Sequence, residues 1–287
     1  MNRVRLVALD LDGTLLDSSG SLPEANAAAC RAASRRAVIA VATGRRARKA
    51  VRLLAAFDFP YYLITCSGAR LERVPDRSPL FTAFLDTGLL ARAASLLLEA
   101  GRSLLLFTAE DPAGDVLVLR SGPLHPHMEA YIERNRDHLR GVLRPPSLSP
   151  AALGGLLPAD VHFMSVVGGA DELRSLQSRL DAVFPARFNT HVVTNITAPG
   201  AVLDMLPAGV SKWRTLMRLA DFLGVSRGEI AAVGDDENDR EMLREAGVSV
   251  AMGNASDSLK AVADLHTAGN DEGGAALALE MLGLTGD

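Results

Sequence analysis

The stretch Leu6–Asp17, LVALDLDGTLLD, decides the fold. An apolar run leads to two carboxylates, Asp10 and Asp12, and then to Gly13. A short apolar run that stops at a glycine is typical of a buried strand with an abrupt end. In an open α/β sheet, ligands bind beyond the carboxyl ends of the strands. We therefore expect Asp10 and Asp12 at the mouth of a site.

Two carboxylates one residue apart suit a hard divalent cation such as Mg2+. A carboxylate beside such a cation can also act as a nucleophile and form an aspartyl-phosphate. The alternative is a strand that ends in an ordinary acidic turn, so the rest of the sequence has to decide between the two interpretations.

The composition excludes several classes of protein. With 287 residues and 48% hydrophobic residues, the chain can form two domains with buried cores. The net charge of −4 argues against nucleic acid or an anionic membrane as the main partner. Cys30 and Cys66 form no metal-binding pattern, and we expect both to be buried in a reducing compartment. We find no signal peptide and no apolar run of about 20 residues, which predicts a cytoplasmic protein without a membrane span.

The order of predicted elements indicates a chain with an insertion. Strands at 37–42 and 61–66 alternate with helices at 24–36 and 46–57, which is the pattern of a doubly wound fold. The order of predicted elements then changes to one typical of a small α+β domain. The alternation of strands and helices resumes near residue 202. We predict an α/β core with a Rossmann-like, doubly wound parallel sheet over residues 1–85 and 190–287. The α+β insertion is expected over residues 86–189.

Two further clusters offer groups that could bind a phosphate. Thr43 and Gly44 follow a predicted strand and present a hydroxyl and backbone amides to an oxyanion, although an ordinary helix cap is the alternative. Lys212 opens a predicted helix, where its ammonium can balance a phosphate and a carboxylate at once. Only three lysines occur in the chain, at positions 49, 212 and 260, which weakens the alternative of a solvated surface lysine.

The last cluster is Gly234–Asp239, GDDEND, which follows an apolar strand. Its four acids would repel one another in a closed site without a cation. A solvated acidic loop is the alternative. We favour a metal site because the strand delivers these acids to the same edge of the sheet as Asp10.

Together these clusters predict phosphoryl transfer from a monoester. Mg2+ would bridge Asp10, a second acid and a phosphate oxygen. Asp10 would attack phosphorus, and Asp12 would protonate the leaving oxygen and later deprotonate the attacking water. Thr43 and Lys212 would hold the equatorial oxygens, where negative charge must be stabilised.

These motifs resemble those of the haloacid dehalogenase (HAD) superfamily. The resemblance lies in DLDGT at 10–14, the strand-end Thr43, Lys212 in GVSK and the GDDEND string, with support from VATGR (41–45), AGVSVAMGNA (246–255) and NDEGG (270–274). The insertion resembles the type C2B cap of the Cof-like sugar phosphatases in length and pattern. The resemblance therefore covers the core more closely than the insertion.

The resemblance implies Asp10 as nucleophile and Asp12 as general acid and base. It also implies Mg2+ bound by the Asp10 carboxylate, the Asp12 backbone carbonyl and Asp235, with Asp239 in support. Asn238 is expected near the phosphate. The chain departs from the branch at Ser67, Asp204 and Trp213, where Asn, Glu and Gly are usual, and Ser67 bears on contacts to the leaving group. Candidate substrate contacts from the insertion are His125, His127, His162 and Arg187.

We expect a Mg2+-dependent phosphatase for a small phosphorylated metabolite, with a sugar phosphate as the leading candidate. One alternative is a phosphomutase, in which a sugar hydroxyl replaces water as the acceptor on the same core. Another is a phosphometabolite-binding protein without turnover, against which the two intact carboxylates argue. We expect a monomer or homodimer.

Overall fold

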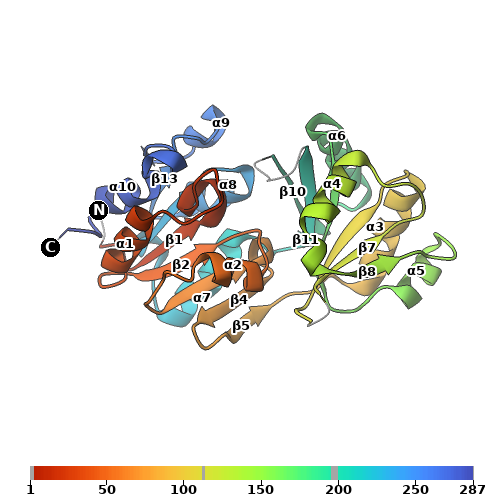
Figure 1. The fold of residues 1–287 in the computed structure, drawn as a ribbon, viewed down its shortest axis with the longest axis horizontal. Helices are drawn as coiled ribbons and strands as arrows, with labels where there is room; N and C mark the ends of the chain where they lie inside the picture. Colours follow the sequence, from red (N-terminus) through yellow and green to blue (C-terminus); the bar gives the residue numbers. More distant parts are fainter. Residues whose placement is uncertain (1–2, 112–113, 195–199, 287) are drawn as a thin grey trace. The chain divides into compact units, whose positions relative to one another are not determined.

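The computed structural model describes residues 3–111, 114–194 and 200–286 (Figure 1). The chain forms two compact units, one of Met1–Thr82 with Val210–Asp287 and the other of Ala83–Gly209. We call the first the core unit and the second the inserted unit. The second unit interrupts the first in sequence, so the predicted insertion is present.

The core unit contains a sheet with the strand order β14-β13-β12-β1-β2-β3-β4-β5. Its neighbours are parallel from β14 to β3, whereas β4 and β5 add an antiparallel edge. The strands are β1 (Leu6–Asp10), β2 (Val38–Ala42), β3 (Tyr61–Thr65), β4 (Arg70–Val74), β5 (Ser78–Thr82), β12 (Ile230–Gly234), β13 (Val248–Ala251) and β14 (Leu265–His266).

Helices cover both faces of this sheet. The strand β1 shows this, because its side chains alternate between two apolar clusters. Val7 and Leu9 belong to one apolar cluster, whereas Leu6 and Ala8 belong to another on the opposite face. Residues from α1 (Glu24–Ala33), α2 (Ala47–Leu53) and α10 (Gly274–Met281) complete the first cluster. Residues from α7 (Lys212–Leu223), α8 (Arg240–Glu245) and α9 (Asp257–Lys260) complete the second. The predicted doubly wound core is therefore confirmed.

The register of the parallel strands brings their carboxyl ends to one edge. Asp10 at the end of β1 is level with Ala42 at the end of β2. On the other side of β1, Leu9 is level with Val233 of β12. Thr43 and Asp235 follow these two strands directly, so both emerge beside Asp10.

The inserted unit has its own sheet, with the order β10-β11-β9-β6-β7-β8. Its neighbouring strands are antiparallel except for β7 and β8. A separate apolar cluster joins this sheet to its helices. The strands are β6 (Leu104–Thr108), β7 (Val116–Leu119), β8 (Leu139–Leu143), β9 (Val161–Gly168), β10 (Phe188–Val193) and β11 (Ala201–Pro207), and the helices are α3 (Thr87–Glu99), α4 (Pro126–Arg134), α5 (Pro150–Leu156) and α6 (Ala170–Val183).

The second boundary of the insertion differs from the predicted one. We expected the core to resume at residue 190, but the inserted unit extends to Gly209. The reason is that β11 pairs with β9 and β10, both within the inserted unit. An apolar strand has the same sequence pattern whichever sheet it joins, so residues 202–206 were wrongly placed in the core. Asp204, one of the departures from the family pattern, lies on this strand and accepts a hydrogen bond from Ser165.

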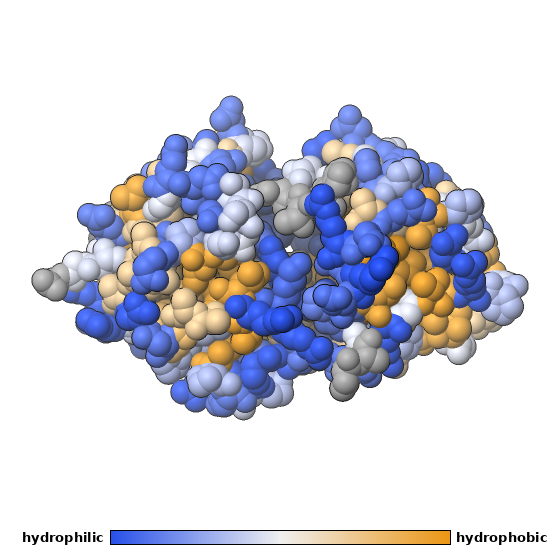
Figure 2. Space-filling model, viewed as in Figure 1, coloured by the Kyte–Doolittle hydropathy of each residue, from blue (hydrophilic) through white to orange (hydrophobic). Residues whose placement is uncertain are grey.

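The surface mixes hydrophilic and apolar side chains on the face that Figure 2 draws. Phe222 on α7 is the most exposed of the large apolar residues described, at 66%. Among the described residues, no helix has both the length and the apolar character that a membrane crossing requires.

The internal packing predicts that substitution of two leucines of the core unit by alanine changes the free energy of unfolding by very different amounts. Leu63 on β3 is fully buried, whereas Leu277 on α10 is 43% exposed. Leu63→Ala should lower the free energy of unfolding by about 2–5 kcal/mol, because it leaves a cavity among close-packed neighbours. Leu277→Ala should change it by less than about 0.5 kcal/mol. Thermal and urea unfolding would measure both, and equal losses for the two variants would contradict the assignment of the core.

Candidate active site

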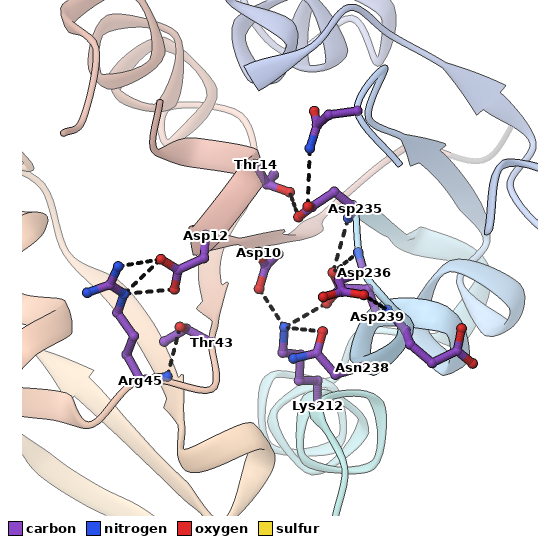
Figure 3. Close-up of polar contacts among 12 residues, drawn as sticks. Asp10, Asp12, Thr14, Thr43, Arg45, Lys212, Asp235, Asp236, Asn238 and Asp239 are labelled. Atoms are coloured by element: carbon purple, nitrogen blue, oxygen red, sulfur yellow. Dashed lines mark hydrogen bonds and ion pairs between the residues drawn. The ribbon is translucent and has the colours of Figure 1, made fainter. Parts of the chain in front are cut away.

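The candidate site is built from segments that follow strand ends or begin a helix (Figure 3). Asp10 ends β1, Thr43 follows β2, and Asp235 follows β12. Lys212 is the first residue of α7. Asp239, from the same segment as Asp235, lies 229 positions after Asp10 in the sequence. The structure nevertheless gathers Asp10, Lys212, Asp235 and Asp239 in one place.

Lys212 is at the centre of the hydrogen bonds of the site. Its side chain is 1% exposed. The ammonium donates to the Asp10 carboxylate, to Asp239 Oδ1 at 2.7 Å and to Asn238 Oδ1 at 3.2 Å. The solvated surface lysine considered above is therefore excluded for this residue.

Burial and opposite charge act against each other in this cluster. Burial, and next the charge of Asp239, raise the pKa of Asp10 well above its ordinary value, although Lys212 acts in the other direction. Burial on its own would lower the pKa of Lys212, but the carboxylates of Asp10 and Asp239 outweigh it and raise that pKa. The ammonium therefore stays charged, and this single cation faces two carboxyl groups, those of Asp10 and Asp239.

A close backbone contact fixes the position of the first turn of α7, which Lys212 begins. The side chain of Ser211 caps α7 by accepting from the Arg214 amide at 3.1 Å. Gly68 packs against this cap, since a Cβ added at Gly68 would lie 2.3 Å from the Ser211 carbonyl oxygen. Thr215 strengthens the contact by donating to the Gly68 carbonyl at 2.7 Å. Gly68 also has a φ of +109°, which suits glycine, so this position permits no larger residue without a shift.

The acids of Gly234–Asp239 divide into a buried and an exposed group. Asp235 and Asp239 are buried, whereas Glu237 is exposed and pairs with Arg240. Asp239 Oδ2 accepts the backbone amides of Asp235 at 3.1 Å and Asp236 at 3.2 Å. The alternative of a solvated acidic loop therefore fails for Asp235 and Asp239.

Asp235 is held by two further side chains. Thr14 donates its hydroxyl to Asp235 Oδ1 at 2.9 Å, and the Asn254 amide donates to Oδ2 at 3.2 Å. Asn254 also donates to the Gly13 carbonyl at 2.9 Å, so it ties Asp235 to the segment that follows Asp10. Both carboxylate oxygens of Asp235 are thus fixed in direction.

The carboxylate group fits a divalent cation. One oxygen from each of Asp10, Asp235 and Asp239 lies within 4.8 Å of the others. All three side chains are buried, and a cation among them would offset the charge that raises the pKa of Asp10. Oxygen ligands of this kind suit Mg2+. The Asp12 side chain is outside this group, so any part it takes in metal binding comes from its backbone carbonyl and stays a prediction.

Asp12 instead pairs with Arg45. The Arg45 Nε lies 2.7 Å from Asp12 Oδ2 and 2.9 Å from Oδ1, and a terminal nitrogen also contacts Oδ1. Figure 3 shows the Asp12 carboxylate directed toward Arg45, while that of Asp10 is directed toward Lys212. The Thr43 hydroxyl accepts the Arg45 backbone amide at 3.0 Å, and Thr43 is buried beside Gly44.

Sequence reasoning assigned no role to Thr14, Arg45 or Asn254. Each lies inside a string that carried the family resemblance, namely DLDGT, VATGR and AGVSVAMGNA. That signal marked the segments, but only coordinates reveal which carboxylate each side chain contacts. Ser67 has a buried hydroxyl without a partner in the structure, and a Cβ on Gly44 would lie 3.3 Å from it.

The candidates from the insertion have different surroundings. His162 on β9 is buried, bonds to the Ala83 carbonyl at 2.8 Å and stacks on Phe84, which favours a structural role. His125 precedes α4 and accepts the His127 amide. Arg187 is exposed before β10. A role for these residues in substrate binding stays a prediction.

Comparisons with known proteins match nearly the whole length of the chain. An Arabidopsis thaliana protein named Endoribonuclease YBEY, chloroplastic, is 28% identical over 94% of this chain, which spans 45% of that relative. The Bacillus subtilis 5-amino-6-(5-phospho-D-ribitylamino)uracil phosphatase YwtE is 27% identical over 97% of this chain and 98% of its own length. The solved structure of BT1666 from Bacteroides thetaiotaomicron, a HAD-superfamily phosphatase, superposes with a TM-score of 0.77. It is 24% identical and covers 98% of this chain and 96% of its own, which supports the fold.

The family assignment rests on a match along nearly the full chain. A family model described as haloacid dehalogenase-like hydrolase matches residues 7–279, which extend over parts of both units and include the residues of the candidate site. The chain therefore belongs to the haloacid dehalogenase-like hydrolase family, as its motifs indicated.

Proposed function

We propose that the protein is a Mg2+-dependent phosphatase that hydrolyses a phosphate monoester of a small metabolite through an aspartyl-phosphate. The observation that carries this proposal is the buried Lys212 ammonium between Asp10 and Asp239, two acids that form one cluster with Asp235. A protein that only binds a phosphorylated metabolite has no need of a carboxylate nucleophile whose orientation is fixed by a buried lysine.

Asp10 would be the nucleophile. Its oxygen attacks phosphorus, a bond forms between them, and the bond from phosphorus to the ester oxygen breaks. Asp12 would give its proton to the departing oxygen, so that the alcohol leaves neutral. Asp12 then takes a proton from water, which attacks phosphorus, releases inorganic phosphate and restores the Asp10 carboxylate.

The phosphoryl group would be held by groups around Asp10. Lys212 supplies a fixed positive charge, and Thr43, the Gly44 amide and Asn238 supply further polar contacts for its oxygens. These contacts suit the transition state, in which charge spreads over the equatorial oxygens. Asn238 supports this role because it already contacts the Lys212 ammonium.

Asp10, Asp235 and Asp239 would hold the Mg2+, together with the Asp12 backbone carbonyl. When bound, the cation neutralises negative charge on the acids and on the phosphoryl oxygens. Thr14 and Asn254 would keep the Asp235 carboxylate in a fixed orientation for this purpose.

For the substrate, we propose a phosphorylated sugar or a related polyol. The name of YwtE describes a substrate with a phosphorylated ribityl chain, and this relative aligns over 98% of its own length. We further propose that the insertion acts as the C2B-type cap of the family and that the protein is cytoplasmic, as a monomer or homodimer.

The nucleophile gives the first test. Purified protein should release phosphate from p-nitrophenyl phosphate only when Mg2+ is present. Asp10→Asn should reduce kcat by at least about 1,000-fold, because an amide cannot form the acyl phosphate. The control is Asp171→Asn, which removes an exposed carboxylate from α6 of the inserted unit. An Asp10→Asn protein as active as wild type would refute the proposal.

Lys212 predicts a linked change in activity and stability. Lys212→Met should reduce kcat about 100-fold or more, since a fixed charge on the phosphoryl oxygens is lost. It should also destabilise the metal-free protein by about 3–5 kcal/mol, because Asp10 and Asp239 lose their buried counter-ion. Added Mg2+ should raise the melting temperature of this variant more than that of wild type. An unchanged melting temperature without metal would contradict the role given to the ion pair.

Asn254 predicts a change in metal affinity. Asn254→Ala should weaken Mg2+ binding about 10–100-fold, because Asp235 loses the group that orients it. Calorimetric titration with Mg2+ measures this without reference to activity. Asn135→Ala, in which the lost amide caps α4 of the inserted unit, is the matched control and should bind Mg2+ as wild type does. Equal affinities for Asn254→Ala and wild type would show that Asn254 does not support the metal.

A further inference from the structure

A second basic residue, Lys49, feels the charge of Asp12 in addition to Arg45. Lys49 lies on α2, four positions after Arg45, which is about one helical turn. The charges that act on its ammonium come from Arg45, Arg46 and Asp12, so the same carboxylate acts on Lys49 and pairs with Arg45. In the part of the chain that the structure describes, Lys49 has no hydrogen bond or ion pair.

Arg45 has unused hydrogen-bond donors although it is paired with Asp12. Its contacts with Asp12 use Nε and one terminal nitrogen. A guanidinium carries five N–H groups, so the remaining terminal nitrogen and one further hydrogen are not engaged by Asp12. The Arg45 side chain is 14% exposed and that of Asp12 is 34% exposed, so solvent reaches this side of the pair.

Lys49 differs from the other basic residues of its helix. Arg48 and Arg52 on α2 are exposed, whereas Lys49 is half-buried. Burial lowers the pKa of Lys49, and the charges of Arg45 and Arg46 lower it further. Holding an unpaired ammonium in such a place costs free energy, which a bound anion would offset. A lysine kept only for solubility would face the solvent.

The position of Asp12 indicates which part of the substrate meets these cations. In the proposed reaction, Asp12 protonates the oxygen of the leaving alcohol. The first atoms of the leaving group therefore lie against Asp12, within reach of the long side chains of Arg45 and Lys49. The phosphoryl group itself is assigned to Lys212, Thr43 and Gly44, so it does not account for this second pair of cations.

We propose that Arg45 and Lys49 form an anion subsite for the leaving group, and that the preferred substrate is a phosphate monoester whose alcohol part carries a second oxyanion. This inference rests on the proposed phosphatase function and narrows its substrate class. A carboxylate or a second phosphate offers the same chemistry to the two cations, so the experiment includes an arm for each.

The test compares esters that share the reacting phosphate. One pair is 2-phosphoglycolate and ethyl phosphate, which differ by a carboxylate. The other is propane-1,3-diol bisphosphate and propane-1,3-diol monophosphate, which differ by a phosphate. With Mg2+, the wild-type kcat/KM should favour the anionic member of at least one pair by about tenfold or more, as expected for a charge-assisted contact. The pair with the larger ratio identifies the second anion.

Substitutions then assign the preference to Lys49. Lys49→Met keeps the length of the side chain but removes its charge, and should lower the ratio about tenfold. Lys49→Arg should retain most of it. Arg52→Met, on the exposed part of the same helix, removes an equal charge and should leave the ratio as in wild type. A fall of the same size in Arg52→Met would assign the effect to the general field of the helix and overturn the subsite.

Failure of this inference is distinct from failure of the proposed function. Hydrolysis of p-nitrophenyl phosphate with equal kcat/KM within both pairs would retain the phosphatase and reject the subsite. Absence of all hydrolysis would reject the phosphatase. In that case calorimetric binding of the same esters to the wild-type protein still measures the preference, and equal affinities would reject the subsite as well.

Discussion

The buried ammonium of Lys212 is the interaction on which the candidate site depends. The side chains of Asp10, Asp235 and Asp239 converge and are buried, so three negative charges there would repel one another. Lys212 offsets part of that charge by contacting Asp10 and Asp239 directly. It also aims the Asp10 carboxylate, as an orienting partner aims a nucleophile. The remaining negative charge makes the cluster a suitable place for a divalent cation and then for a phosphoryl group.

The sheet makes this convergence possible. Parallel strands β1, β2 and β12 end at the same edge, so the residues that end or follow them, Asp10, Thr43 and Asp235, emerge side by side. Lys212 does not follow a strand of the sheet but begins α7. Gly68 lets its own backbone approach that of Ser211, the residue before Lys212, closely. A rigid scaffold of buried strands thus fixes one group of charges, and a close backbone contact fixes the other.

Much of the core could be predicted from the sequence because its strands are short apolar runs that end at glycines or acids. The helix predicted to begin at Lys212 agrees with α7, and the strands predicted at 37–42 and 61–66 agree with β2 and β3 within a residue. The boundary after residue 189 could not be predicted, since β11 is as apolar as a core strand and only its pairing with β9 places it. No strand was predicted at 139–143 (β8), because Gly141 and the exposed Val142 break the apolar–polar alternation that is typical of a strand. The contacts of Arg45, Thr14 and Asn254 also required coordinates, because each joins residues that are distant in sequence.

The central claim is that Asp10, Lys212 and Asp235 act on one phosphoryl group and one cation. The most direct measurement is a crystal structure with Mg2+ and beryllium trifluoride, which mimics a phosphoryl group on an aspartate. Our account predicts beryllium bonded to the Asp10 carboxylate, a fluorine in contact with the Lys212 ammonium, and Mg2+ in contact with both Asp10 and Asp235. Beryllium trifluoride bound elsewhere, or Mg2+ bound away from Asp10, would contradict it.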